Sequence, residues 1–369
     1  MMKSFAHLLA LVLTHIYRLP PGRIVALAGT AYVLLLSGCG TPIGADRVTT
    51  RQAYEQVEKN ALSGGKPSAD AAWIINRYGL TKLAEEHPDE AVRALHAYAL
   101  RTGDRDILYA LAELSFVAGD FVDQSVRRWD RPDPRDFYLG AAVYSYLFLF
   151  SEEPHGAKPS SFDRRFRNAC DLYNHGLGLA LKEWRNTNNV VHLEGGKRRL
   201  PVGEITIEFD HSAFPWELGL VDKFLLADEF AVRGLSVRVR EPGVGAPLLA
   251  VSKQVEKLRL SRTAPATTFL RLNSSLPEMA DGRGTGRLEL YSVFDRATVS
   301  IGNTAVPLEA DLTTHRAYTM NQTFAWRVER LQFLNPAAAL KSQLIQTSPY
   351  RPGQVPVVFV HGTFSSPVW

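Results

Sequence analysis

Residues Pro356 to Trp369 read PVVFVHGTFSSPVW and carry the strongest fold signal in the 369-residue chain. The run Val357–Val360 is β-branched and aromatic without a polar interruption, which is typical of a strand buried on both faces of a parallel sheet. His361 and Gly362 follow this run directly, and small or hydroxyl residues come after them. This order predicts a buried strand that opens into a glycine-containing loop.

A buried strand followed by His-Gly and then by small and hydroxyl residues resembles the oxyanion-hole loop of the α/β-hydrolase family. The resemblance implies that a backbone N–H of this loop helps to bind the oxyanion. Thr363 would supply that N–H, with its neighbour Phe364 as the alternative. Gly362 would let the backbone turn close to the substrate carbonyl, and His361 would shape the loop. Family membership implies acyl-transfer hydrolysis of an ester, lipid or similar substrate.

The serine nucleophile of such an enzyme lies in a Gly-x-Ser-x-Gly elbow, and the 369 residues contain no such motif. In this family the serine, the acid and the catalytic histidine follow one another after the oxyanion-hole loop. We therefore expect residues 326–369 to be the incomplete start of a hydrolase domain, truncated before the nucleophile. The chain alone should be inactive, because an oxyanion hole accelerates nothing without an attacking serine and its base.

The N-terminal segment, residues 1–38, contains three basic residues and no acidic one, and its apolar run Ile24–Leu36 is followed by Ser37, Gly38 and Cys39. This pattern resembles a bacterial lipoprotein signal peptide with its lipobox. The resemblance implies that Cys39 carries a diacylglyceryl group and begins the mature chain, with residues 39–50 as a linker. A plain signal anchor is the alternative, but the apolar run is shorter than the roughly 20 residues that span a bilayer.

The residue after the lipidated cysteine bears on the location of the protein. Gly40 stands there, and the absence of an aspartate favours export to the outer membrane under the lipoprotein sorting rule that the resemblance implies. We therefore expect a protein of the cell envelope that is lipid-anchored and faces the periplasm. Its first partner would be the membrane, through the N-terminal lipid.

Charge and motif content limit the other partners. The chain has 42 Lys+Arg and 38 Asp+Glu, and the signal segment holds three of those cations, so 39 basic and 38 acidic residues remain. A nearly neutral chain lacks the basic footprint that nucleic acid binding requires. The sequence contains no His-Glu-x-x-His, Cys-x-x-Cys or Walker motif, so we expect no metal and no cofactor. If Cys39 is lipidated, Cys170 has no disulfide partner.

Residues 51–185 have a helical pattern. Ile107, Leu111, Leu114 and Ala118 recur at spacings of three and four, which predicts one buried helix stripe, and Gly119 is the expected C-terminal cap. Small alanines with nearby tyrosines are reminiscent of tetratricopeptide-type repeats, and so we expect a TPR-like region that binds a protein partner. The predicted helices are Ala91–Leu100, Ile107–Ala118, Tyr138–Phe150 and Phe166–Trp184.

Residues 186–325 have a sequence pattern typical of short β-strands. A hairpin is predicted around the Gly195-Gly196 turn, and the alternation of Leu235, Val237 and Val239 with polar residues predicts a half-buried antiparallel strand. Several short strands in succession suggest a sandwich-like β domain. The other predicted strands are Leu200–Phe209, Pro247–Val251, Thr267–Leu272, Arg287–Phe294 and Thr298–Ile301.

Together these patterns predict a multi-domain chain: a TPR-like helical region, a β-rich sandwich-like domain, and then the first strands of an α/β-hydrolase fold. The function implied by the resemblance is that of a membrane-anchored serine hydrolase of the esterase or lipase kind. The alternative is a non-catalytic envelope lipoprotein that uses its helical region as a protein-interaction module.

Overall fold

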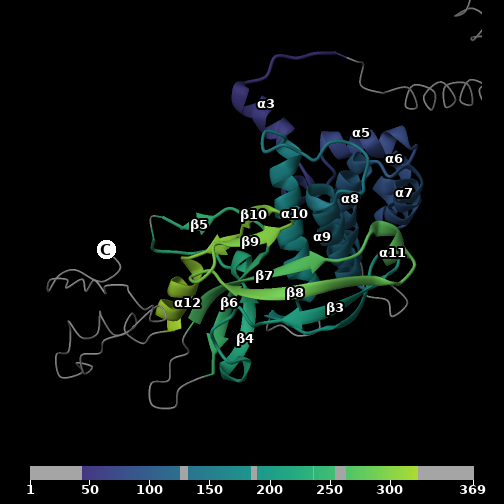
Figure 1. Cartoon of the computed structure of the whole chain (residues 1–369). Coiled ribbons are helices and arrows are strands. Elements are labelled where there is room, and N and C mark those ends of the chain that lie inside the picture. Colours follow the sequence, from purple (N-terminus) through teal and green to yellow (C-terminus); the bar gives the residue numbers. More distant parts are fainter. Residues whose placement is uncertain (1–43, 125–131, 184–188, 236, 254–262, 323–369) are drawn as a thin grey trace, which may run out of the picture. The chain divides into compact units, whose positions relative to one another are not determined.

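Helices occupy the first half of the described chain and strands most of the second half (Figure 1). The predicted signal peptide, residues 1–38, and the predicted hydrolase start, residues 326–369, lie outside the described part. The chain divides into the units Met1–Ala53 and Tyr54–Trp369, and the contacts discussed below belong to the second. The residues that this computed structural model describes are 44–124, 132–183, 189–235, 237–253 and 263–322.

The four helices predicted from the sequence are present, with ends that differ by a few residues. Helix α9 begins where the Asp133 side chain accepts a hydrogen bond from the N–H of Arg135, with Pro134 in its first turn, and Asp163 caps α10 in the same way. The helices are α3 (Thr50–Val57), α4 (Ala61–Gly64), α5 (Ala69–Arg77), α6 (Thr81–Glu86), α7 (Pro88–Thr102), α8 (Arg105–Gln124), α9 (Pro134–Phe150), α10 (Arg164–Leu181), α11 (Leu276–Ala280) and α12 (Thr314–Gln322).

Gly119 does not end its helix, and this prediction was wrong. Helix α8 continues through Gly119 to Gln124. A Cβ at Gly119 would lie 2.7 Å from a ring carbon of Tyr138, so the missing side chain lets α9 pack closely against α8. The buried surface of α8 is also wider than one stripe, because α4, α5, α7, α9 and α10 all contact this helix.

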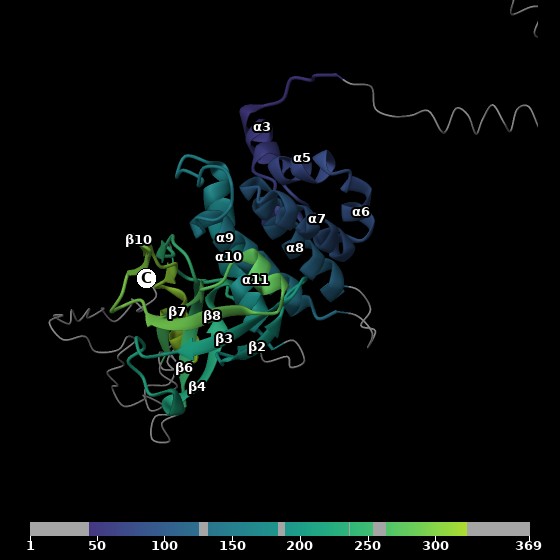
Figure 2. The ribbon, with the colours of Figure 1, turned by 45° about the vertical axis from the view of Figure 1, so that its right-hand side comes forward.

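Helix α9 is buried almost all around and packs between α8 and α10 (Figure 2). Its contact with α10 is close at Gly176, where an added Cβ would lie 2.8 Å from the Tyr138 carbonyl oxygen. At its C-terminal end, the buried Arg105 guanidinium donates to the carbonyls of Phe148 and Ser151 at 2.8 and 2.7 Å. In the described part of the chain, no helix is both long and apolar enough to cross a membrane.

The main sheet has seven strands in the order β1-β4-β6-β7-β8-β3-β2, and the pairing of β3 with β8 is parallel while the other pairs are antiparallel. Two short two-stranded sheets, β9 with β10 and β5 with β11, accompany it. The strands are β1 (Val190–Val191), β2 (Gly196–Arg199), β3 (Glu204–Asp210), β4 (Val221–Leu226), β5 (Arg240–Glu241), β6 (Ala246–Ser252), β7 (Thr263–Leu272), β8 (Gly284–Ser292), β9 (Thr298–Ile301), β10 (Thr304–Pro307) and β11 (Ala310–Asp311).

The hairpin exists, but its turn lies further along the chain than predicted. Strands β2 and β3 pair from Gly196 with Ile207 to Arg199 with Glu204, so the turn is formed by residues 200–203. Gly203 has a positive φ of 83° in this turn, and an added Cβ would meet the Met279 carbonyl at 2.0 Å. The first arm of the predicted hairpin, which contains β1, pairs with β4 and not with the predicted Leu200–Phe209 strand.

A half-buried strand was predicted at Leu235, Val237 and Val239. This prediction was wrong about the strand and about the burial of these side chains. No strand is assigned to the described residues before Arg240 in this segment, and Val237 is 67% exposed. The inward position belongs to Arg238, whose guanidinium donates to Asp311 Oδ2 at 2.9 Å and to the carbonyls of Ala227 and Phe230. The ion pair with a buried carboxylate therefore determines which face turns inward.

The second layer of the β region is helical, which differs from the sandwich-like arrangement predicted. Helix α10 contacts β6, and the Tyr173 hydroxyl donates to the Leu270 carbonyl and accepts from the Leu270 N–H, each at 2.7 Å. Helical and strand residues belong to one hydrophobic cluster, in which Tyr146, Tyr173 and Phe269 have ring centroids 5.7–6.2 Å apart. The helices and the main sheet thus share a core.

Candidate functional site

The sequence-predicted site residues cannot be placed. His361, Gly362, Thr363 and Phe364 of the expected oxyanion-hole loop, and the expected lipidation site Cys39, all lie outside the described residues. The candidate site of the described part is a different one, and the sequence reasoning missed it.

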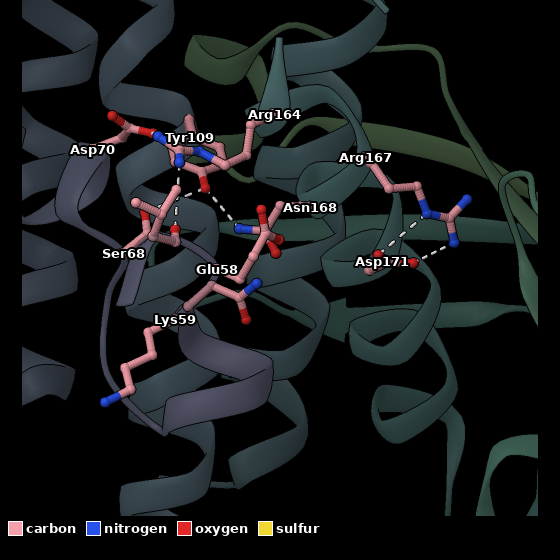
Figure 3. A pocket seen from close by; sticks show the side chains of 11 residues that line it. Glu58, Lys59, Ser68, Asp70, Tyr109, Arg164, Arg167, Asn168 and Asp171 are labelled. Atoms are coloured by element: carbon pink, nitrogen blue, oxygen red, sulfur yellow. Dashed lines mark hydrogen bonds and ion pairs between the residues drawn. The ribbon is translucent and has the colours of Figure 1, made fainter. Parts of the chain in front are cut away.

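A polar pocket of about 90 Å³ opens where the loop before α4, the start of α5, helix α8 and the first two turns of α10 meet (Figure 3). Its lining is dominated by charged and amide side chains, with one tyrosine. The lining residues are Val57, Glu58, Lys59, Asn60, Ser68, Asp70, Tyr109, Arg164, Arg167, Asn168 and Asp171.

Local sequence rules place these side chains. Arg164, Arg167, Asn168 and Asp171 follow the helical spacing of three and four, so one face of α10 supplies four of them. Ser68 precedes α5, where its hydroxyl accepts the N–H of Ala71 at 3.3 Å. The pocket is therefore held by helix ends and by one helix face.

Three lining residues donate to the Glu113 carboxylate, which has no exposed surface. The Tyr109 hydroxyl donates to Glu113 Oε1 at 2.6 Å, and Asn168 Nδ2 donates to the same oxygen at 2.5 Å. The N–H of Ser68 donates to Glu113 Oε2. Asn168 Nδ2 also donates to the Tyr109 oxygen at 2.6 Å. Two lining side chains and one backbone N–H thus share a single buried acceptor.

Burial raises the pKa of Glu113, and the donors Tyr109, Ser68 and Asn168 act in the opposite direction by stabilising its charged form. Burial also raises the pKa of Tyr109, and the neighbouring Glu113 carboxylate adds to this effect. Tyr109 therefore remains a hydrogen-bond donor at neutral pH. Glu113 does not line the pocket and acts on it only through Tyr109, Asn168 and Ser68.

The pocket wall carries both signs of charge in equal number. Lys59, Arg164 and Arg167 are basic, and Glu58, Asp70 and Asp171 are acidic. Arg164 Nη2 lies 3.3 Å from Asp70 Oδ2, and Arg167 pairs with Asp171. Because the charges balance, the wall suits a small polar or zwitterionic ligand, or ordered water, better than a polyanion.

One wall residue links the pocket to the sheet region. Arg167 Nη2 lies 3.2 Å from Oε2 of Glu309, a carboxylate that is 3% exposed, and Arg240 Nη2 lies 2.9 Å from its Oε1. The N–H of Gly243 donates to Glu309 Oε2 at 2.7 Å. This cluster, in which only the Glu309 carboxylate is buried, links α10 to the chain around β5 and β11.

Sequence reasoning missed the pocket because its residues come from four separate segments. One local signal was available: Glu113 is the only acidic residue in the apolar run Ile107–Ala118. A carboxylate inside such a run requires buried donors, which is a reason to look for a polar site. Within the described ranges, no group of three His, Cys, Asp or Glu side chains is placed to hold a metal ion.

Comparisons with protein-family models, with curated proteins and with solved structures found no match for this chain.

Proposed function

We propose that this chain is a lipid-anchored cell-envelope protein of the α/β-hydrolase type, in which the helical region is a binding module placed before the hydrolase segment. The single observation that supports the hydrolase assignment is the run Val357–Val360 followed by His361 and Gly362. The lipobox at Leu36–Cys39 supports the anchor. Full hydrolase activity would require a serine elbow, a motif that these 369 residues do not contain.

The helix-rich part supports the binding role. Short helices joined by tight turns, with α7 packed on α8, are compatible with a TPR-like arrangement of helix pairs. The charge-balanced pocket between α5, α8 and α10 offers a place for a polar group. In the alternative function, the protein is a non-catalytic lipoprotein, and this binding role is its whole activity.

The anchor is tested by growing cells with an alkyne-tagged fatty acid and measuring label on the protein. We expect labelling of the wild type and loss of label in Cys39→Ala, with the protein released from the membrane fraction. Cys170→Ser is the matched control, because that cysteine is buried and should not receive lipid. Equal labelling of Cys39→Ala and wild type would contradict the anchor.

The hydrolase assignment is tested on the product of the natural gene. The coding DNA beyond codon 369 is sequenced, and the native protein is treated with a fluorophosphonate probe that labels activated serines. A reading frame that continues into Gly-x-Ser-x-Gly, with a labelled product well above 41.0 kDa, would support a working hydrolase. A stop codon and an unlabelled product near the mass of residues 39–369 would favour the non-catalytic alternative.

A further inference from the structure

Five side chains at the end of α5 and on α7 form a continuous stack, which we call the aromatic face: Trp73, Arg77, Tyr78, Tyr98 and Arg101. The Arg77 guanidinium lies 5.8 Å from the Trp73 ring centre and 5.7 Å from that of Tyr78. The Tyr78 and Tyr98 rings have centroids 4.5 Å apart, and the Arg101 guanidinium lies 4.5 Å from the Tyr98 ring centre. The order along the surface is therefore ring, cation, two stacked rings and a second cation.

This face is open to solvent. Trp73 is 61% exposed, although burial of a tryptophan side chain removes a large apolar area from water. Arg77 and Arg101 are exposed, and Tyr78 and Tyr98 are half-buried. Trp, Tyr and Arg are the residue types that dominate binding energy at protein interfaces.

The stack also fixes the geometry of the side chains before any partner arrives. Tyr78 ends α5, where its N–H donates to the Ile74 carbonyl at 3.3 Å, and Gly79 turns the chain with a φ of 70°. Tyr98 lies on the regular helix α7. Ordering such side chains on binding costs less conformational entropy than ordering free ones, so the face is preorganised.

The charge of the face is positive. Within the described part of the chain, the Arg101 guanidinium has neither an ion pair nor a hydrogen bond, and it lies over the Tyr98 ring. Arg77 forms a long ion pair with Asp104, in which Nη1 lies 3.9 Å from Oδ2 and the Arg77 side chain stays 54% exposed. A partner that brings carboxylates would therefore pair with the Arg101 guanidinium and share the exposed Arg77 guanidinium with Asp104.

We propose that the aromatic face binds an acidic segment of a partner protein, with carboxylates at Arg77 and Arg101 and an apolar or aromatic side chain on Trp73. This inference specifies the partner of the binding module and rests on that part of the proposed function. Two guanidinium groups on a nearly neutral chain do not form the basic track that nucleic acid needs, so a protein segment is favoured.

The probe is a fluorescein-labelled twelve-residue peptide of glutamate, aspartate and two phenylalanines, titrated into the full chain and followed by fluorescence anisotropy. We expect saturable binding that weakens with added salt and falls by about tenfold or more in Trp73→Ala and in Arg101→Glu. The affinity of Arg101→Gln for the peptide should lie between the affinities of Arg101→Glu and the wild type. A peptide with lysine in place of the acidic residues should not bind.

Lys82→Glu is the matched control, because Lys82 on α6 is 85% exposed, lies outside the face and changes charge by the same amount. It should bind the peptide like the wild type, and circular dichroism should give all variants the same melting temperature. The proposal is overturned by no binding, by equal loss in Lys82→Glu, by unchanged binding in Trp73→Ala, or by tighter binding of a single-stranded oligonucleotide of equal charge. None of these outcomes touches the fatty-acid and fluorophosphonate readouts, so this inference can fail while the proposed anchor and hydrolase assignments stand.

Discussion

The Glu113 carboxylate is completely buried, and its donors come from three elements: Ser68 before α5, Tyr109 on α8 and Asn168 on α10. A buried acceptor that loses a donor costs more free energy than the lost hydrogen bond itself, because water cannot replace the donor. The three donors therefore stabilise the Glu113 carboxylate together, and their hydrogen bonds fix the positions of three residues that line the pocket.

Replacing Tyr109 with phenylalanine should lower the free energy of unfolding by about 1–3 kcal/mol, because the fully buried Glu113 carboxylate loses one of its donors. Urea unfolding followed by circular dichroism measures the change. Tyr54→Phe is the control, since Tyr54 is exposed and its replacement should change stability by less than about 0.5 kcal/mol. Equal stabilities of Tyr109→Phe and Tyr54→Phe would show that the Tyr109 hydrogen bond contributes nothing.

His96 should make the protein sensitive to acid. Burial lowers the pKa of this histidine from 6.5 to about 4, so the unfolded chain takes up a proton more readily than the folded one between these pH values. Its contribution to stability is then complete above about pH 6.5 and is lost as the pH falls towards 4. The difference of about 2.5 pH units corresponds to about 3 kcal/mol at 1.36 kcal/mol per unit.

The measurement compares the free energy of unfolding of wild type and His96→Gln at pH 7 and at pH 4. Any loss of the 2.8 Å hydrogen bond between His96 Nδ1 and the Tyr144 hydroxyl affects the stability of the variant at both pH values. The variant should therefore gain up to about 3 kcal/mol relative to the wild type on going to pH 4. A difference between the two proteins that does not change with pH would contradict the lowered pKa.

Among the elements, the contact between α9 and α10 depends on a glycine in mid-helix. Alanine at position 176 should improve helix propensity by up to about 1 kcal/mol, but its Cβ would press on the Tyr138 backbone oxygen at 2.8 Å. We expect a net loss of about 1–3 kcal/mol in unfolding free energy, because backbone cannot move aside as a flexible side chain can. Gly64→Ala in α4 is the control, as its nearest neighbour is a Lys59 side-chain atom at 3.8 Å. Thermal unfolding of both variants would show whether the steric clash or the helix propensity determines how alanine at position 176 changes stability.

The helices were largely predictable, because apolar residues at spacings of three and four specify a buried helix face with little help from the rest of the chain. The error at Gly119 arose because a glycine that ends a helix and a glycine that admits a neighbouring ring look alike in sequence. Only the packing partner Tyr138 distinguishes them, and it lies 19 residues further along.

The strands were predictable as strands but not in their pairing. The predicted runs at Pro247–Val251 and Thr298–Ile301 coincide with β6 and β9. The order β1-β4-β6-β7-β8-β3-β2 depends on long-range pairing that alternation does not encode. At residues 235–239 the alternation was real, but the Arg238 pair with Asp311 determined the inward face.

The pocket was not predictable from any motif, since its wall joins residues 57–60, 68–70, 109 and 164–171. The pocket is formed by the fold and not by a local sequence pattern. The predicted oxyanion-hole residues and Cys39 lie outside the described residues and remain predictions.

On the scale of the whole molecule, the Glu309 cluster should make the helical and strand regions unfold together. Glu309→Gln removes the charge that faces Arg167 and Arg240, and we expect a loss of about 2 kcal/mol, below the value for a fully buried pair because both arginines are partly exposed. Differential scanning calorimetry should show one transition that shifts as a whole. The exposed pair Arg283–Asp281 provides the control, and Asp281→Asn should leave the transition in place. Two separate transitions would argue that residues 51–185 and 186–325 are independent domains.

The position of Tyr173 bears on how this protein avoids aggregation through strand pairing. Strand β7 pairs with β8 at Leu270, but on its other side the pairing with β6 stops at Ala246 and Thr268. On that side the Leu270 peptide groups lack a strand partner, and the Tyr173 hydroxyl takes its place. An unpaired strand edge is a template for a strand from another molecule. The helical region therefore also protects the sheet from such pairing. In a fragment that begins at residue 186, this edge would be free to pair with strands of other molecules.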